Sequence, residues 1–132
     1  MNFDAIGAAW APRLLSILRI MGGLMLFEHG TAKVLRFPVV PTMANLDLSS
    51  LPGVAGFFEL IGGALLLIGL FTRPVAFILA GMTAVAYFYA HAPRGFFPIL
   101  NGGELAALYC FVFLYLAAAG PGPWSVDSMR RK

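Results

Sequence analysis

The sequence predicts an all-α fold, a four-helix transmembrane bundle with both termini on the cytoplasmic side. Three observations support this prediction. Of the 132 residues, 60% are hydrophobic and only 11% are charged, whereas an average soluble domain has about 25% charged residues. The apolar residues form four stretches, each near the length of about 20 residues that a helix needs to cross a bilayer. Basic residues and both tryptophans gather near one end of these stretches.

The expected spans lie within a single membrane domain that covers residues 1–132. Their approximate ranges are 13–35, 53–71, 74–91 and 102–120. The first span is followed by Pro38 and Pro41, and proline cannot continue a helix. Residues 2–11, before this span, are a candidate for a separate helix in the membrane interface. The last three spans are near the short limit, so we expect little tilt or a thin bilayer.

Short connections constrain how the later spans are arranged. Spans two and three are separated only by Thr72-Arg73-Pro74, so they should form an antiparallel hairpin. Pro74 also suits the first position of a helix. A longer loop then leads to Asn101-Gly102-Gly103, where the fourth span begins. Four crossings place both termini on the same side of the membrane.

Basic residues indicate which side this is, because cytoplasmic loops carry an excess of Lys and Arg. The side of the termini has Arg13, Arg73, Arg130, Arg131 and Lys132. The opposite side has Lys33, Arg36 and Arg94. Trp10 and Trp124 fall at the boundary near the termini, where aromatic anchors are common. We therefore expect both termini to be cytoplasmic.

Several classes of function are not expected from this sequence. The net charge of +3 comes without a basic run or an aromatic-basic alternation, so no nucleic-acid partner is predicted. Cys110 is the only cysteine, which excludes an intrachain disulfide and a cysteine-based metal cluster. Adjacent Glu28 and His29 point about 100° apart, and no Glu-x-x-His pair accompanies His91 or His29. No metal site is therefore predicted, and haem is not expected.

Ionisable residues inside the spans are the main functional clue, since a charge at mid-membrane costs about 2.5–3.5 kcal/mol. Rotation by 100° per residue places Arg19, His29 and Lys33 on one glycine-rich face of the first span. Glu59 shares its face of the second span with Gly56, Gly62 and Gly63. Arg19 lies roughly 10 Å deeper than Glu59. It either pairs with Glu59 or extends toward the cytoplasmic boundary, a behaviour called snorkelling.

The third and fourth spans also bring polar residues toward the outer end. Tyr87 and His91 follow Thr83 at four-residue intervals, which places all three on one stripe of the third span. Glu104 shares a face of the fourth span with Phe111. The four spans together predict a polar cluster in the outer half of the membrane.

Each of these groups also has a structural explanation. Glu104 is a first-turn carboxylate of the kind that the helix dipole favours. Lys33 can snorkel to the membrane boundary, and His91 can be an interfacial histidine. A structural ion pair that holds the helices together is the corresponding explanation for Arg19 and Glu59.

The motifs and their order resemble the DoxX family of small bacterial membrane proteins over about residues 13–127. The resemblance is carried by Phe27-Glu28-His29-Gly30 with Lys33, the run from Phe58-Glu59 through Gly62-Gly63 to Gly69-Leu70-Phe71-Thr72-Arg73-Pro74, Asn101-Gly102-Gly103-Glu104, and Gly120-Pro121-Gly122 with Ser125-Val126-Asp127. The resemblance implies a four-helix bundle in the bacterial cytoplasmic (inner) membrane. It also implies an association with respiratory or sulfur oxidoreduction, through thiosulfate and quinone chemistry.

The leading hypothesis from the sequence is a small membrane subunit of a quinone-linked oxidoreductase. Glu59 and Glu104 would accept protons, and Arg19 would supply opposite charge. The residues expected to contact the quinone are His29, Lys33, Tyr87, His91 and Phe111. No redox centre is evident in the chain, so electrons would come from elsewhere.

Two other hypotheses stay open. In one, the protein is a non-catalytic anchor or assembly subunit, and its buried charges only set helix register and partner choice. In the other, it provides a small solute or proton pathway. The expected partners are membrane lipid and either other subunits of a complex or further copies of the chain.

Overall fold

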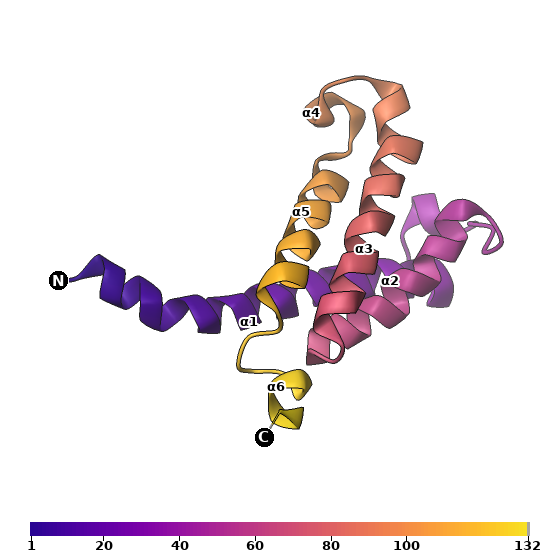
Figure 1. Ribbon diagram of the computed structural model, residues 1–132. Coiled ribbons are helices and arrows are strands. Elements are labelled where there is room, and N and C mark those ends of the chain that lie inside the picture. Colours follow the sequence, from indigo (N-terminus) through magenta and orange to yellow (C-terminus); the bar gives the residue numbers. More distant parts are fainter. Residues whose placement is uncertain (132) are drawn as a thin grey trace.

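The computed structural model describes residues 1–131 and is helical, with no strand in that part of the chain. Figure 1 shows the arrangement. The four long helices are α1 (Phe3–Gly30), α2 (Leu51–Ile68), α3 (Thr72–Ala86) and α5 (Glu104–Ala119). The short helices are α4 (Pro98–Asn101) and α6 (Val126–Arg130). Single π-helical turns at Thr31–Leu35 and Tyr87–His91 extend α1 and α3, and 3-10 turns occupy Pro41–Met43 and Ala92–Arg94.

Helix α1 begins ten residues before the expected start of the first span. The side chain of Asn2 caps it, because Oδ1 accepts hydrogen bonds from the backbone N–H groups of Asp4 and Ala5 at 3.0 and 3.2 Å. The helix then continues through Pro12 without interruption. Residues 2–11 are therefore the first turns of the same helix and not a separate interfacial helix.

Three helical segments are long and apolar enough to cross a membrane: Phe3–Leu35, Leu51–Ile68 and Thr72–Arg94. Helix α5 is equally apolar in character but has only 16 residues. A helix of that length extends about 24 Å at 1.5 Å per residue, slightly less than the hydrocarbon core of a typical bilayer. These lengths and compositions are those of a multi-pass membrane protein.

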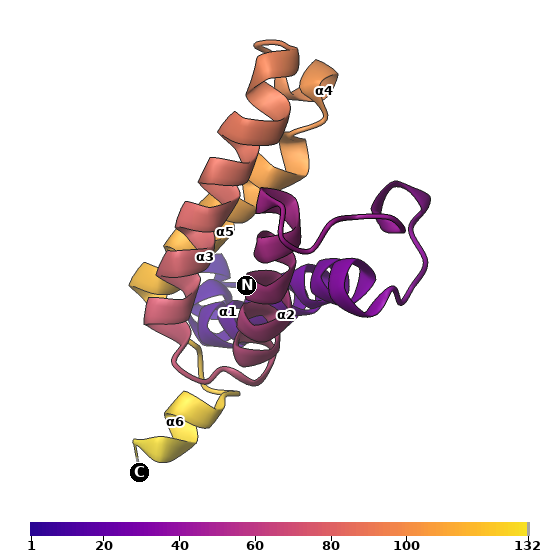
Figure 2. The same ribbon diagram turned by 90° about the vertical axis from the view of Figure 1, so that its right-hand side faces the viewer.

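The long helices pack as two pairs, α1 with α2 and α3 with α5. The two pairs run in different directions and meet where α2 and α1 pass α3 and α5, as the two views show (Figures 1 and 2). The core lies at this crossing. It consists of Leu26, Leu66, Ala76, Leu79, Ala80, Tyr109, Phe113 and Leu116.

Glycines allow α1 and α2 to approach so closely that their backbones touch. A Cβ atom on Gly30 would lie 2.3 Å from the backbone nitrogen of Leu60, and one on Gly63 would lie 2.6 Å from that of Phe27. Real side chains never come this close, so larger residues would force the helices apart. The paired glycines seen in the sequence therefore have a packing role.

The last residues of the described chain form a strap across the end of the helices opposite to Leu51. We define this C-terminal strap as residues 120–131. Its Asp127 accepts hydrogen bonds from the backbone N–H groups of Phe71 and Thr72, each at 2.9 Å, and so caps the start of α3. Arg19 of α1 donates two hydrogen bonds to carbonyl groups of the strap.

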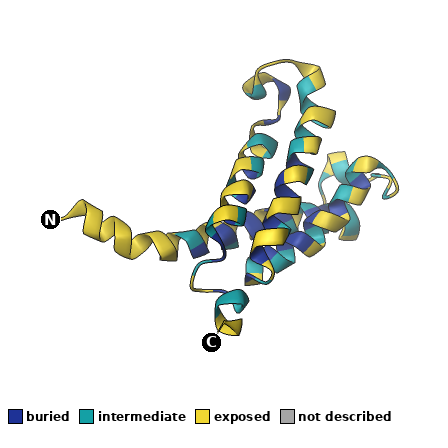
Figure 3. Cartoon of the chain, viewed as in Figure 1, coloured by how far each residue is buried: buried dark blue, intermediate teal, exposed yellow. Residues whose placement is uncertain are grey.

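Burial is uneven along the molecule (Figure 3). Buried residues concentrate where the helix pairs cross, whereas residues 3–14 of α1 are exposed on every side. This segment extends away from the other helices (Figure 1).

Candidate functional site

An ion pair joins α2 to the π-helical turn that extends α1. Lys33 Nζ donates to Glu59 Oε1 at 2.8 Å. Glu59 is only 7% exposed. Within the described residues this is the only ion pair. A buried carboxylate next to a lysine is expected to be costly to disrupt, because the remaining partner would be an uncompensated charge.

A glycine on α2 explains how Lys33 reaches this carboxylate. A Cβ atom on Gly56 would lie 3.0 Å from Lys33 Cβ and 3.2 Å from its Cδ. The aliphatic stem of the lysine therefore lies across the surface that a larger side chain would occupy. The snorkelling expected for Lys33 is wrong, because the empty position at Gly56 lets the side chain turn toward α2 and pair with Glu59.

Glu59 and Lys33 line a pocket of about 300 Å³ between α2 and the C-terminal part of α3 with the π-helical turn that follows it. The walls are mainly apolar, and the polar groups are few. The full lining is Lys33, Leu51, Pro52, Val54, Ala55, Phe58, Glu59, Met82, Val85, Ala86, Tyr89, Ala90 and His91. An apolar cavity with a small number of converging polar groups is the usual form of a small-molecule site.

The second carboxylate oxygen of Glu59 is unpaired among the described residues. Oε2 is buried and has no hydrogen-bond partner. Leaving a buried oxygen unpaired costs about 1–3 kcal/mol, and more if it is charged. A ligand hydroxyl would satisfy the ionised oxygen, and a ligand carbonyl would satisfy it if the carboxyl carried a proton.

His91 lines the pocket from the π-helical turn after α3, and a backbone carbonyl contacts its ring. Its Nδ1 lies 3.1 Å from the backbone carbonyl oxygen of Asn101. A carbonyl can only accept, so Nδ1 is the donor in this contact. The Asn101 side chain is also hydrogen-bonded, through Nδ2, to Tyr87 Oη at 3.1 Å and to the carbonyl of Gly95 at 2.9 Å.

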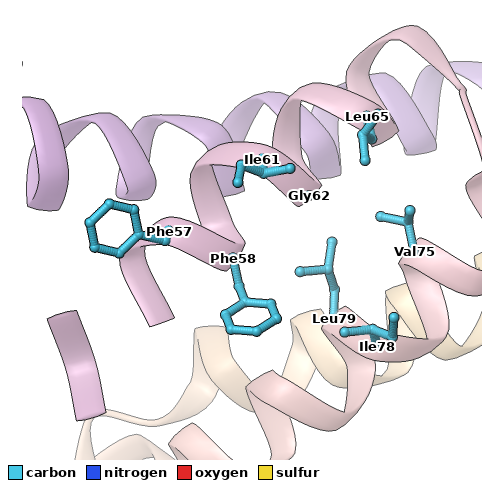
Figure 4. A pocket seen from close by; sticks show the side chains of 8 residues that line it. All are labelled: Phe57, Phe58, Ile61, Gly62, Leu65, Val75, Ile78 and Leu79. Atoms are coloured by element: carbon cyan, nitrogen blue, oxygen red, sulfur yellow. The ribbon is translucent and has the colours of Figure 1, made fainter. Parts of the chain in front are cut away.

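A second, wholly apolar pocket adjoins the first along the groove between α2 and α3. Its volume is about 260 Å³. Figure 4 shows its lining side chains, from Phe57 and Phe58 on α2 to Val75, Ile78 and Leu79 on α3. Phe58 lines both pockets. The groove is therefore polar near Glu59 and purely hydrocarbon along the rest of its length.

His29 lies near the ion pair but does not line the pocket of Glu59. Its ring makes an edge-to-face contact with Tyr109, with the ring centres 6.1 Å apart. It lines a smaller depression of about 250 Å³ with Glu28 and residues of the following loop. Tyr109 stacks on Phe113, and its hydroxyl is buried without a partner.

Arg19 is not a partner of Glu59. Its Nε donates to the carbonyl of Leu66 at 2.8 Å, and its two terminal nitrogens donate to the carbonyls of Pro121 and Trp124. It is 1% exposed. The alternative in which Arg19 pairs with Glu59 is therefore wrong, because each of its three nitrogens donates to a carbonyl group of the last turn of α2 or of the C-terminal strap.

Two further residues expected at the site lie on an outward face. Glu104 begins α5 and is exposed, and Phe111 is 68% exposed. Neither lines the pocket of Glu59. The reason is that α5 packs against α3 through its opposite face, which carries Tyr109 and Phe113. The ring of Tyr87 lies next to that of His91. Tyr87 does not line the pocket, and it is connected to it by the hydrogen bond from Asn101.

Sequence reasoning missed the roles of Asn101 and Tyr89. Asn101 is 1% exposed and connects α4, the end of α3 and Gly103. The Asn-Gly-Gly triplet was a detectable signal of a turn, since Gly102 has a φ of +75°. Tyr89 lines the pocket from the π-helical turn, and such turns carry no reliable sequence signal.

Among the described residues, no group of three or more His, Cys, Asp or Glu side chains is placed to hold a metal ion.

The comparisons with known proteins agree with the architecture. A model of the DoxX family matches residues 14–92. The chain is similar to an uncharacterised protein of Haemophilus influenzae, with 46% identity over 123 residues that cover 90% of this chain and 92% of the relative. A second uncharacterised protein of the same organism is 35% identical over 97 residues, or 74% of this chain and 63% of the relative. No solved structure matches the chain.

Proposed function

Because this chain belongs to the DoxX family of membrane proteins, we propose that it is a small subunit of a quinone-linked oxidoreductase that binds a quinone headgroup beside Glu59. The observation that carries this proposal is that Glu59, whose Oε2 atom is buried and has no partner among the described residues, lines a mainly apolar pocket. The polar ligand atom that would satisfy it must belong to a molecule that is otherwise hydrophobic.

The form of the groove supports a ligand with a polar head and an apolar tail. The pocket at Glu59 has polar groups at one end, whereas the adjoining pocket has none among its lining side chains (Figure 4). The volumes of the two pockets are about 300 and 260 Å³, respectively. A quinone has a ring with two oxygens, attached to a long hydrocarbon chain, and would place these parts in the two pockets respectively.

The residues of the pocket would hold the two redox forms by different hydrogen bonds. Lys33 is a donor only, so it suits a carbonyl oxygen. An ionised Glu59 is an acceptor only, so it suits a hydroxyl. Nε2 of His91 accepts when the ring is neutral and donates when it is protonated. A bound quinone supplies two-electron, two-proton redox chemistry, and in this proposal a partner subunit exchanges the electrons.

We further propose a topology with four crossings of the bacterial inner membrane and both termini in the cytoplasm. The positive-inside rule supports this orientation, with most of the basic residues near the termini. The pocket at Glu59 would then lie in the outer half of the bilayer. Protons taken up or released there would exchange with the outer side.

Photolabelling with a short-chain azidoquinone tests the proposal directly. The full chain would be reconstituted in lipid nanodiscs, illuminated with the probe and digested for mass spectrometry. We expect labelled peptides from residues 51–59 and 82–91, and competition by an unlabelled quinone. Glu59→Gln keeps the shape of the side chain but removes its charge, and should reduce labelling at least tenfold.

Glu28→Gln is the matched control, because it removes the same charge from an exposed carboxylate outside the pocket. It should leave labelling unchanged. Helix content by circular dichroism verifies that both variants are folded. Equal labelling of Glu59→Gln and the unchanged chain, or labels scattered over lipid-facing residues, would contradict the quinone site.

A role as an anchor for other subunits is a second candidate, favoured by the exposed first part of α1. Residues 3–14 are all exposed and include Phe3, Ile6, Trp10 and Leu14. A photocrosslinking amino acid at Ile6 should capture a protein partner in native membranes. The same group at Phe77, which is exposed on α3, should give lipid adducts only. Lipid adducts alone from both positions would contradict this role.

A further inference from the structure

A second charged pocket lies at the opposite end of the molecule from Leu51. Its lining residues come from the turn between α2 and α3, from Pro121 after the end of α5, and from α6 and the residue that follows it. Figures 1 and 2 show these segments close to one another. Its volume is about 370 Å³. Its charged lining residues are Arg73, Arg130, Arg131 and Asp127.

The charges in this pocket are unbalanced. Its lining includes three guanidinium groups and one carboxylate. None of the three arginines forms an ion pair with a described residue. Both oxygens of Asp127 are already occupied by the backbone N–H groups of Phe71 and Thr72. Within residues 1–131, which the structure describes, the lining of the pocket therefore carries more positive than negative charge.

Two of the arginines are held in place by the protein. Nη1 of Arg73 donates to the carbonyls of Ala117 and Ala118 at the end of α5. A Cβ atom at Gly120 would lie 2.9 Å from Nη2 of Arg73, so the guanidinium rests on this glycine. Arg130 stacks over the Phe71 ring, with Cζ 5.1 Å from the ring centre. Such stacking leaves the N–H groups at the edge of the guanidinium free to bind an anion.

We propose that this pocket binds the phosphate of an anionic phospholipid. Arginine forks match phosphate oxygens, and basic pockets at the ends of membrane helices are known to hold lipid headgroups. The surroundings favour a lipid over a free anion. Phe71 and Trp124, both 52% exposed, lie at this end of the apolar helices, where aromatic side chains face the headgroup layer. Acyl chains could thus follow the helices while the phosphate occupies the pocket.

This lipid site is independent of the quinone proposal. It uses other residues at the other end of the helices, and neither site shares a lining residue with the other. Loss of lipid binding without loss of quinone labelling would show that only the lipid proposal had been affected.

Native mass spectrometry of the full chain tests the lipid site. The protein would be released from nanodiscs that contain phosphatidylglycerol and phosphatidylcholine in equal amounts. We expect one phosphatidylglycerol to stay bound and phosphatidylcholine to be lost. Arg130→Gln with Arg131→Gln should weaken retention about 30-fold, which corresponds to about 1 kcal/mol for each arginine. Arg73 is left unchanged because it also caps α5.

Arg36→Gln with Arg94→Gln is the matched control, since it removes two exposed positive charges from the opposite end. Its retention of phosphatidylglycerol should equal that of the unchanged chain. Addition of inorganic phosphate separates the two sources of phosphate. The proposal predicts no displacement of lipid by millimolar phosphate. It is overturned if phosphate displaces the lipid fully, if both double variants lose it equally, or if neither loses it.

Discussion

Lys33 and Glu59 meet across the interface of α1 and α2, with Nζ 2.8 Å from Oε1, and the same two side chains line the pocket between α2 and α3. One interaction thus belongs both to helix packing and to the candidate binding site. A substitution that alters the packing against Lys33 should therefore also alter ligand binding in the pocket.

Gly56→Leu should break this pair without touching either charged residue. The new side chain would occupy the space in which the stem of Lys33 lies, only 3.0 Å from the position of the added Cβ. Glu59 would be left without its cation, and we expect the free energy of unfolding to fall by about 3 kcal/mol. Azidoquinone labelling should fall as well. Gly81→Leu is the control, because nothing lies within 4 Å of a Cβ at that position. Equal stability of the two variants would show that Lys33 does not depend on Gly56.

Arg19→Leu should destabilise the protein through the C-terminal strap. The carbonyls of Pro121 and Trp124 would lose their donor, and a buried group left unsatisfied costs about 1–3 kcal/mol. Denaturation in mixed detergent, followed by circular dichroism, should show a loss of about 3 kcal/mol. Arg13→Leu, at an exposed position, should cost under 1 kcal/mol.

A double-mutant cycle distinguishes this role from a charge pair with Glu59. The effects of Arg19→Leu and Glu59→Gln should add, because the two residues share no partner. Lys33→Met and Glu59→Gln should not add. A coupling energy above about 1 kcal/mol between Arg19 and Glu59 would contradict the assignment.

Gly30→Ala should separate α1 from α2. An added Cβ would lie 2.3 Å from the backbone nitrogen of Leu60, and backbone atoms cannot move aside locally. We expect a loss of about 3 kcal/mol, at the upper end of the cost of overpacking. Gly7→Ala, in the exposed part of the same helix, should instead raise stability by up to about 1 kcal/mol. Thermal unfolding midpoints of the two variants provide the comparison.

Asp127 should make stability depend on acid pH. Burial acts to raise its pKa, but hydrogen bonds from the backbone of Thr72 and Phe71 and the charge of Arg130 outweigh it, so the pKa lies below its ordinary value. A carboxylate with a lowered pKa stabilises the folded state above its unfolded pKa of about 3.9, and this stability is lost as pH falls through the folded pKa.

Asp127→Asn should therefore lower stability by about 1 kcal/mol at pH 7, a usual value for a helix cap. The difference from the unchanged chain should shrink below about pH 4. Unfolding midpoints measured from pH 7 down to pH 3 provide the test. A difference that is constant over this range would show that the charge of Asp127 contributes nothing.

The helices were predictable from the sequence because their signals are local. Long apolar runs interrupted by proline and glycine produced ranges close to those of α2, α3 and α5. The start of α1 was not predictable. The helix begins at Phe3, after an asparagine cap, and continues through Pro12, although proline usually indicates a helix boundary.

The site was predictable only in part, since partners far apart in the sequence decide it. Glu59, Lys33 and His91 line one pocket. The partners of Arg19 could not be predicted from the sequence. They are backbone carbonyls, which every residue type has. Glu104 faces outward because α5 packs through the opposite side, and the low amphipathic contrast of that helix concealed this.

The arginine at position 19 has a consequence for biosynthesis. Its acceptor at Pro121 is separated from it by 102 positions, so a growing chain inserts Arg19 long before that acceptor has been translated. The guanidinium must stay hydrated or near lipid phosphates until the last apolar helix has entered the bilayer. Final assembly is thus a late event, and nascent chains stopped before Pro121 should be more readily degraded than longer ones.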